Sequence, residues 1–343
     1  MIQPYLAKLV ERTDLSRTEA QAAMLEMMEG NVTPVLMAAF LVALRMKGET
    51  VDEVTGLAEA MREKMTPVCP KARPLVDTCG TGGDKVKTFN ISTAAAFAAA
   101  GAGAAIAKHG NRAVSGVCGS ADVLEALEIR LDLTPQQVAD CIDRVGIGFM
   151  FAPSLHPAMK HAAPVRREMG IRTVFNLLGP LANPARAQAQ VLGVYSPALT
   201  ESHARVLKNL GSERALVVHG MEGLDEISVA GPTQVSELAD GEVRTRTIVP
   251  EEFGLSRASI EDLRSGSNPR ENAEMLVQVL EGKIGPKRDA VLLNAAGALI
   301  AAAKASSFRE GILMAAESID SGLAMRKLDA LRSYSQKVSA GHV

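Results

Sequence analysis

The first 65 residues place apolar side chains at helical spacing, and each apolar run has its own start and stop signals. Ser16 with Glu19, and Thr50 with Glu53, have the spacing of capping boxes, while Gly30 provides a stop. No segment before residue 66 has the pattern of a strand. The sequence therefore predicts three helices, "AQAAMLEMMEG", "PVLMAAFLVALRMKG" and "VDEVTGLAEAMREKM".

The middle helix, from Pro34 to Gly48, is apolar on nearly all sides. A helix of this kind needs burial on more than one face, which a small helical unit cannot supply alone. Either a partner subunit or the rest of the same chain could cover it, and the pattern does not decide between them.

The pattern of apolar and polar residues changes after the connector "TPVCPKARP". Its three prolines predict a stiff, extended segment at a domain boundary. Beyond it, short apolar runs alternate with helical patterns, which favours a largely parallel sheet with helices on its faces. The predicted strands are "LVDTCG", "GAAIAKHG", "AQVLGVYS" and "RALVVHG". The predicted helices are "NISTAAAFAAA", "SADVLEALE" with Ser120 as its N-cap, "PRENAEMLVQVLEG", "DAVLLNAAGALIAAAKA" and "FREGILMAAESIDSGLAMRKLDAL".

Composition excludes several classes of protein. The 343 residues are 47% hydrophobic and 22% charged, which is typical of a soluble globular protein of one or two domains. A net charge of −2 and 3% aromatic content without tryptophan argue against a nucleic-acid partner or a base-stacking surface. No apolar run is long enough to span a bilayer, and no signal-peptide pattern is present. Four cysteines without paired or metal-ligand spacing predict reduced thiols and a cytoplasmic protein.

The loop "DTCGTGGD", residues 77–84, is the first candidate for chemistry because it follows a predicted buried strand. Gly80, Gly82 and Gly83 allow a ligand to approach the main chain, and successive amides can form an anion-binding nest. The helix behind the loop adds its dipole and unpaired N–H groups. The polar side chains at that helix start are Asn90, Ser92 and Thr93. A phosphate or diphosphate is the expected ligand. For an isolated loop of this kind, a glycine turn that only connects a strand to a helix is about equally common.

Two familiar phosphate motifs do not fit this loop. The dinucleotide fingerprint fails because Lys85 stands where the third glycine belongs. The Walker pattern fails because Val277 precedes the only Gly-Lys pair at the position of its first glycine.

A second polar loop, "KHGNR", ends the next predicted strand. Lys108 and Arg112 favour an anionic ligand, and His109 and Asn111 accompany them. Either cation alone would be read as part of a solvated turn, and His109 alone as a structural histidine. Since strands of a parallel sheet end at one edge, we expect both loops to face the same ligand.

Adjacent acids, Asp225 and Glu226, follow a third predicted strand in "HGMEGLDEIS". Neighbouring carboxylates suit a hard cation such as Mg²⁺, which is often shared with substrate phosphates. An isolated acidic pair is usually only a solvated turn. Because two loops suited to polyanions are expected nearby, a metal ion shared by the acidic pair and substrate phosphates is the better interpretation of Asp225 and Glu226.

These segments together resemble anthranilate phosphoribosyltransferases. The motifs that carry the resemblance are "DTCGTGGD", "FNIST", "KHGNRAVS", "GSADVLEAL", "HPAMKHAAPVRREMGIRTVFNLLGPLANP" and "GLDEIS". Their order and spacing match the family from about Ser16 to the C-terminal helices, which is nearly the whole chain.

The resemblance implies an α/β fold with a small N-terminal helical domain and a larger domain built on a mostly parallel sheet. This is the architecture of class II nucleoside phosphorylases and type III phosphoribosyltransferases. It places residues 1–69 in the helical domain together with a return segment at about 166–186. Residues 70–165 and 187–343 form the α/β domain. A homodimer joined through the helical domains is also implied.

The family transfers a phosphoribosyl group from phosphoribosyl pyrophosphate to the amine of anthranilate and releases pyrophosphate, in tryptophan biosynthesis. Carried over by matching positions, the phosphoribosyl pyrophosphate site comprises Gly80, Gly82, Gly83, Asp84, Thr88, Asn90, Ser92, Thr93, Lys108 and Ser120. The anthranilate side comprises Gly80, His109, Asn111, His156 and Arg166, with Arg166 facing the carboxylate. The metal set comprises Ser92, Asp225 and Glu226, with two Mg²⁺ ions expected and Asp84 a weaker candidate acting through water. No acid, base or nucleophile is assigned, because the amine itself attacks. Outside the family, His156 would be read as a turn residue and Arg166 as one partner of a surface ion pair with Glu168.

The chain departs from many relatives in the loop "SGVCG". Gly116 and Cys118 replace hydroxyl residues there, and Val117 replaces a basic one, so fewer contacts to phosphate are expected. Cys118 is interpreted as an inert thiol. Glu128 replaces a glycine, which should alter a helix end and not the chemistry.

Two other functions remain open at this level. A pyrimidine nucleoside phosphorylase of the same fold would carry a "KHSTGG"-like loop, which is absent here. A relative that had turned to nucleic-acid binding should show a basic stripe and eroded acidic residues, whereas Asp225 and Glu226 are intact.

Overall fold

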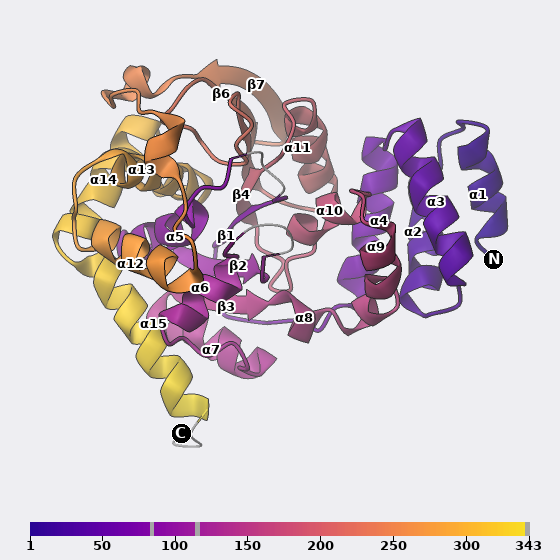
Figure 1. Cartoon of the computed structure of the whole chain (residues 1–343), viewed down its shortest axis with the longest axis horizontal. Coiled ribbons are helices and arrows are strands. Elements are labelled where there is room, and N and C mark those ends of the chain that lie inside the picture. The colour runs from indigo at the N-terminus through magenta and orange to yellow at the C-terminus, as the bar shows by residue number, and fades with distance from the viewer. Residues whose placement is uncertain (83–85, 114–116, 340–343) are drawn as a thin grey trace.

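Two parts of unequal size make up the chain in a computed structural model that describes residues 1–82, 86–113 and 117–339. A bundle of helices lies at one end, and a larger part with a central sheet lies at the other (Figure 1). The bundle contains α1 (Gln3–Val10), α2 (Arg17–Met28), α3 (Pro34–Lys47) and α4 (Val51–Lys64). Both predicted capping boxes, Ser16–Glu19 and Thr50–Glu53, are present at the starts of α2 and α4. Helix α1 was not predicted.

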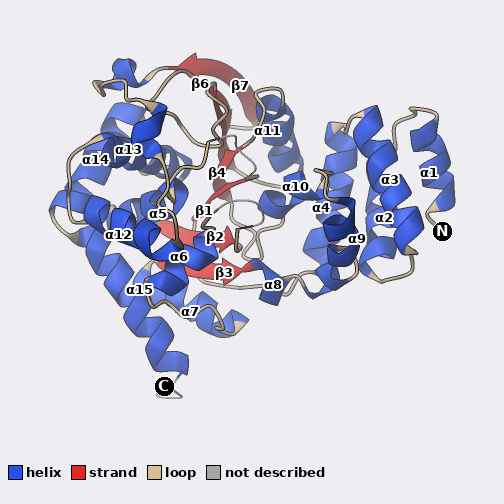
Figure 2. Ribbon diagram, in the orientation of Figure 1, coloured by secondary structure: helices blue, strands red, loops and turns tan. Residues whose placement is uncertain are grey.

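Seven strands form the sheet in the order β3-β2-β1-β4-β5-β6-β7 (Figure 2). The strands are β1 (Leu75–Gly80), β2 (Ala105–Gly110), β3 (Ile147–Phe151), β4 (Ala189–Gly193), β5 (Arg214–Gly220), β6 (Thr233–Ala239) and β7 (Glu242–Ile248). The first five are parallel, and β6 and β7 add an antiparallel hairpin at one edge. The predicted fold class, a helical domain with a larger α/β domain on a mostly parallel sheet, is confirmed.

Helices cover both faces of this sheet (Figure 1). The helices that follow the bundle in the chain are α5 (Ile91–Gly101), α6 (Ser120–Ala126), α7 (Pro135–Val145), α8 (Ala152–Leu155), α9 (Ala163–Met169), α10 (Phe175–Leu178), α11 (Leu199–Asn209), α12 (Pro269–Leu280), α13 (Pro286–Ala301), α14 (Phe308–Asp320) and α15 (Leu323–Ser339). Four short 3₁₀ helices span Pro157–Lys160, Gly179–Leu181, Pro250–Phe253 and Ile260–Leu263.

Alternation along β5 shows how the sheet separates two cores. Leu216 and Val218 point into the core built with α5 and α13, while Ala215 and Val217 point into the core shared with α11 and the helical bundle. Successive side chains of a strand face opposite sides, and a sheet covered on both faces needs apolar residues at consecutive positions. The run "ALVV" in β5 is therefore apolar at every position and does not alternate between apolar and polar residues.

A reversal of winding lies in the middle of the sheet. From β1 the chain moves outward to β2 and β3, and it then crosses back to the other side of β1 to form β4 and β5. Ligands of open parallel sheets bind beyond the C-terminal ends of the strands where the order reverses. Residues 77–80 of "DTCGTGGD" form the end of β1, and the rest of this motif, residues 81–84, is called the glycine loop and follows Gly80 at this point.

The segment from α8 to α10 runs between the sheet and the helical bundle (Figure 1). Val165 of α9 and Phe175 and Leu178 of α10 belong to the same apolar core as Met24 and Leu57 of the bundle. Among the described residues, no helix is both long and apolar enough to cross a bilayer.

Three local predictions were wrong. Gly119 and not Ser120 occupies the N-cap of α6, because Asp122 reaches back to the Gly119 amide. The predicted single helix from Phe308 is divided into α14 and α15 by Gly322, which has a φ of +72°. Helix α13 begins at Pro286, three residues before the predicted Asp289.

Glu128, which follows α6, has a φ of +63°, a conformation that favours glycine.

Candidate active site

The ends of β1 and β4 meet the acidic loop that follows β5. Gly80 and Gly193 are paired at these ends, and a Cβ added to either glycine would overlap Asp225. The amide of Thr81 donates to the Gly193 carbonyl at 2.9 Å, and the amide of Gly82 donates to Oδ2 of Asp225 at 2.8 Å. The structure therefore brings the glycine loop and the acidic pair together. Gly193 was missed from the sequence, where its only signal was a glycine inside a predicted strand.

Glu226 connects the same acidic loop to the start of α5. Its Oε1 accepts a hydrogen bond of 3.1 Å from the amide of Ser92, so it uses an unpaired donor of the helix N-terminus. Burial raises the pKa of the neighbouring Asp225 carboxyl.

The donors present fit Mg²⁺. Within the described part of the chain, no cluster of three or more His, Cys, Asp or Glu side chains is placed to hold a metal alone. Mg²⁺ is usually held by one or two carboxylates and by substrate phosphates, and it does not need an all-protein cage. Asp225, bonded to the amide of Gly82, and Glu226, bonded to the amide of Ser92, supply that smaller set of oxygens.

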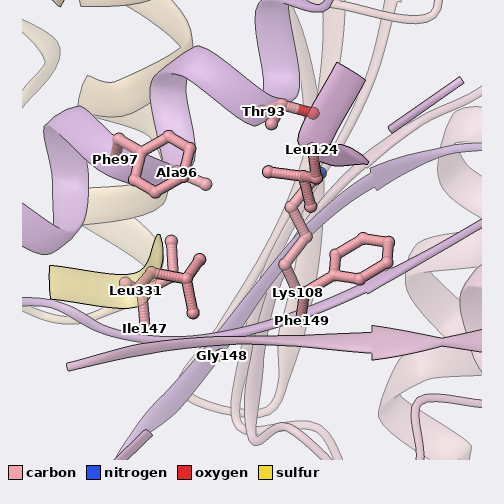
Figure 3. Close-up of a pocket in the computed structure, with 9 residues that line it drawn as sticks. All are labelled: Thr93, Ala96, Phe97, Lys108, Leu124, Ile147, Gly148, Phe149 and Leu331. Atoms are coloured by element: carbon pink, nitrogen blue, oxygen red, sulfur yellow. The ribbon is translucent and has the colours of Figure 1, made fainter. Parts of the chain in front are cut away.

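Lys108 lies deep between β2 and α5, with 3% of its surface exposed. Its ammonium donates to the carbonyl of Thr78 and lies 3.4 Å from both the Thr78 hydroxyl and the Ser92 hydroxyl. Figure 3 shows its side chain rising beside a small cavity toward Thr93, with Phe149 on the other side. Burial lowers the pKa of Lys108, and the charge of Asp77 opposes that shift.

Two polar atoms at the start of α5 have no hydrogen-bond partner among the described residues. They are Oδ1 of Asn90 and Oγ1 of Thr93, and both are buried. Buried polar groups are normally satisfied, so unpaired ones in this position indicate room for a ligand's polar atoms.

The Asn90 amide donates to the carbonyl of Cys118 at 3.2 Å, and burial raises the pKa of the Cys118 thiol to about 12. Cys118 therefore stays protonated and unreactive.

The rings of His109 and His156 contact each other at a tilt of 45°, with their centroids 5.1 Å apart. Burial lowers the pKa of His109 to about 3 and that of His156 to about 4, so both rings are neutral at pH 7. The backbone of Gly179 hydrogen-bonds to His109, and that of Ala182 to His156. Nε2 of each ring is buried without a partner in the described residues.

Arg166 lies over the ring of Phe175, with its guanidinium carbon 5.1 Å from the ring centroid. It makes no ion pair with any carboxylate of the described residues, including its neighbour Glu168. Burial lowers its pKa without removing its charge. A half-buried guanidinium without a carboxylate is suited to an anionic ligand.

Arg112, by contrast, is engaged on the surface. It forms ion pairs with Asp122 and Glu125 of α6, which agrees with the solvated-turn interpretation and leaves it unsuited to grip phosphate. Asn111 beside it is exposed, and its carbonyl accepts a 3.3 Å bond from the Ser120 hydroxyl.

Family comparisons agree with this geometry. Residues 3–65 match the helical bundle domain of the glycosyl transferase family, and residues 72–325 match its α/β domain. The anthranilate phosphoribosyltransferase of Symbiobacterium thermophilum is 59% identical over 98% of this chain and 98% of its own length. That of Acetivibrio thermocellus is 54% identical over 96% of this chain and 95% of its own. The chain belongs to the anthranilate phosphoribosyltransferase family.

Solved structures of anthranilate phosphoribosyltransferases share the whole fold. The enzyme from Thermus thermophilus has a TM-score of 0.92 and 46% identity, covering 96% of this chain and 99% of its own. The enzyme from Saccharomyces cerevisiae, in complex with PRPP and Mg, has a TM-score of 0.90 and 31% identity, covering 98% of each chain. Another structure of the yeast enzyme, with 4-fluoroanthranilate, has a TM-score of 0.88 and 30% identity over 98% of each chain.

Three further residues were expected in the anthranilate phosphoribosyltransferase site, namely Gly83, Asp84 and Thr88. Gly83 and Asp84 lie outside the described residues, as does Gly116 of the variant loop. Thr88 is half-buried and forms an isolated bridge with Arg264 through the backbone.

Proposed function

We propose that this chain joins anthranilate to phosphoribosyl pyrophosphate and releases pyrophosphate, with the site at the ends of β1, β2, β4 and β5 as its catalytic centre. The observation that carries the proposal is the closure of the acidic loop on the glycine loop through Asp225 and Gly82. This contact places carboxylates suited to a metal beside a glycine-rich loop of the kind that binds a diphosphate.

The diphosphate and the ribose are assigned to the glycine loop, the start of α5 and Lys108. The helix N-terminus and the loop amides stabilise negative charge, and the buried ammonium adds a fixed cation. The proposed contacts are Gly80, Gly82, Gly83, Asp84, Thr88, Asn90, Ser92, Thr93, Lys108 and Ser120. The unpaired oxygens of Asn90 and Thr93 support this placement, because a ligand hydroxyl would satisfy them.

Asp225, Glu226 and the Ser92 hydroxyl are proposed to hold Mg²⁺, with two ions in all. When bound, the metal supplies positive charge to the leaving pyrophosphate. Asp225 and Glu226 are held in place beforehand, since each already accepts a backbone amide bond. Such fixed orientation lowers the cost of reorganisation during the reaction.

Anthranilate is assigned to the side lined by Gly80, His109, Asn111, His156 and Arg166. Arg166 would bind the carboxylate, since its guanidinium has no carboxylate partner in the described structure. The neutral rings of His109 and His156 offer hydrogen bonds without repelling or protonating the attacking amine. No side chain needs to act as a nucleophile, and most of the rate gain comes from positioning two substrates.

The chain is proposed to work as a homodimer joined through its helical bundles. Val35 and Met46 of α3 are 78% and 73% exposed, and with Val42 they share one face of the helix. An exposed apolar face of this kind is typical of a subunit interface. We further propose that the helical domain comprises residues 1–69 and the segment at about 166–186, as the shared core of α9 and α10 with the bundle supports.

The proposal is tested by following anthranilate fluorescence with the purified protein. We expect the signal to fall only when phosphoribosyl pyrophosphate and Mg²⁺ are both present. Consumption of a pyrimidine nucleoside with inorganic phosphate, without loss of anthranilate, would instead assign the chain to the phosphorylases of this fold. Loss of neither substrate would contradict both assignments.

A further inference from the structure

Asp77 of β1 is fully buried, with 0% of its surface exposed. Its Oδ1 accepts a 3.0 Å hydrogen bond from the amide of His109 on β2, and its Oδ2 accepts a 2.7 Å bond from Nδ2 of Asn183. A buried carboxylate is costly unless its oxygens are satisfied, so a carboxylate kept here needs a reason. Neither Asp77 nor Asn183 belongs to the substrate contacts assigned above.

Asn183 is equally buried, at 2% exposure, and its side chain is fully engaged. Besides Asp77, its Nδ2 donates to the carbonyl of Ala107 at 2.9 Å, and its Oδ1 accepts from the amide of Ala185 at 2.8 Å. A planar amide with all these bonds made has one orientation. It therefore fixes the loop after α10 relative to β1 and β2.

Both ends of this network lead to the histidine pair. At one end, the Asp77 carboxylate holds His109 by its own amide. At the other, Asn183 directly follows Ala182, whose backbone hydrogen-bonds to the ring of His156. The two rings come from different strands and loops, yet their centroids lie 5.1 Å apart. The Asp77–Asn183 pair therefore links the backbone of His109 to the loop that holds the His156 ring.

We propose that Asp77 and Asn183 are positioning residues for the acceptor substrate: they set the spacing of His109 and His156, and so shape the pocket for the aromatic amine. The inference rests on the proposed function, because it takes these histidines to line the amine side. A carboxylate suits the role because one group can accept from two donors on different segments at the same time.

Asn183→Ala separates this role from an effect on the diphosphate. The substitution is neutral to neutral, and the partners it loses, Asp77, Ala107 and Ala185, are not among the proposed contacts of phosphoribosyl pyrophosphate. We expect the KM for anthranilate to rise about tenfold or more, as misplacement of a substrate-positioning group does. The KM for phosphoribosyl pyrophosphate should change much less. Direct titration of anthranilate fluorescence, without turnover, should show the same weakening.

Asn272→Ala is the matched control, because Asn272 of α12 is also fully buried and its side-chain amide also bonds to backbone groups, those of Gly266 and Asn268. It should lower stability by a similar amount and leave the ratio of the two KM values unchanged. If Asn183→Ala does not fold, Asn183→Ser retains a shorter donor and is used in its place.

The outcomes are separable. If the native protein does not consume anthranilate with phosphoribosyl pyrophosphate and Mg²⁺, the proposed function fails. If the native protein is active and the Asn183 variant changes both KM values equally, or changes only kcat, Asn183 is merely structural and the inference is overturned. A selective loss of anthranilate affinity in Asn183→Ala, absent from Asn272→Ala, supports it.

Discussion

The amide nitrogen of Gly82 lies 2.8 Å from Oδ2 of Asp225, although the two residues are 143 positions apart in the chain. The bond closes the acidic loop on the glycine loop at the point where the sheet reverses its winding. A carboxylate fixed beside an anion-binding loop can bind a divalent ion that the loop's backbone amides alone would repel. The proposed metal and diphosphate sites are therefore joined by a contact between two loops, which neither motif shows alone.

Replacing both Asp225 and Glu226 with Ala should abolish Mg²⁺-dependent turnover, because the carboxylate ligands are removed. A loss of about 10²-fold or more in kcat/KM is expected for removal of this electrostatic stabilisation. The measurement is the anthranilate assay over a range of Mg²⁺ concentrations, with circular dichroism to check that the variant is folded. Unchanged Mg²⁺ dependence in a folded variant would remove the metal assignment.

Gly193→Ala should disturb the same site through the backbone. The added methyl group would overlap the main-chain carbonyl of Asp225, which must then move away from the glycine loop. We expect a loss of roughly 1–3 kcal/mol in the free energy of unfolding from the steric conflict, together with a higher Mg²⁺ requirement.

Gly56→Ala provides the matched control for that substitution. Gly56 of α4 packs against the main chain of Arg17 in the helical bundle, so its methyl group would also meet backbone. This variant should lose stability and keep the native Mg²⁺ dependence. A similar change in Mg²⁺ dependence in both variants would show that the effect is one of general stability.

The sequence predicted many of the elements that have strong local signals, although α7 was missed despite its capping box at Thr134 and Gln137. The capping boxes of α2 and α4, the strands β1, β2, β4 and β5 and the polar loops at their ends all follow from residue type and spacing. The hairpin of β6 and β7 was missed because β7, "EVRTRTI", is an exposed edge strand with few apolar residues. Helix α1 was missed because its apolar residues cover less than two turns and Ile2 gives no cap.

The candidate site was less accessible to sequence reasoning than the fold. Its motifs could be identified, but hydrogen bonds across the sheet are set by tertiary packing. Nothing in the local sequence indicates that Gly193 makes room for Asp225, or that Asn183 satisfies Asp77. Arg112 was read as a possible phosphate ligand because it shares a loop with Lys108, yet α6 places Glu125 within reach of it.

Arg166→Ala should weaken anthranilate binding selectively, because Arg166 is proposed to pair with the substrate carboxylate. We expect the KM for anthranilate to rise about tenfold or more, in line with loss of a charge-assisted hydrogen bond. The KM for phosphoribosyl pyrophosphate should change little. Steady-state kinetics with each substrate varied in turn provides the measurement, and Arg167→Ala, at the exposed neighbouring position, is the control. Equal changes in both KM values would place Arg166 outside the amine side.

Charges on the exposed face of α3 should separate the proposed dimer. The double substitution Val35→Glu and Met46→Glu would bury two unpaired carboxylates if that face is an interface, which is strongly unfavourable. Sedimentation equilibrium should then show a monomer where the native chain is a dimer. Leu313→Glu, at a position of α14 that is 70% exposed, should leave the native assembly unchanged. A native monomer, or an unaltered dimer in the double variant, would contradict the proposed interface.

Buried histidines should make the fold sensitive to mild acid. Burial lowers the pKa of His203 to about 4, alongside the values of about 3 and about 4 for His109 and His156. The unfolded chain takes up protons on these rings from about pH 6.5 downward while the folded chain does not, so stability falls as pH decreases below that value. Each ring should contribute a loss on the order of 1 kcal/mol between pH 7.5 and pH 5.5. His203→Asn keeps a donor for the Leu199 carbonyl, which accepts from His203 at 3.0 Å. Urea denaturation at the two pH values should therefore show a smaller loss in this variant than in the native chain, and an equal loss would show that His203 is not neutral in the folded state.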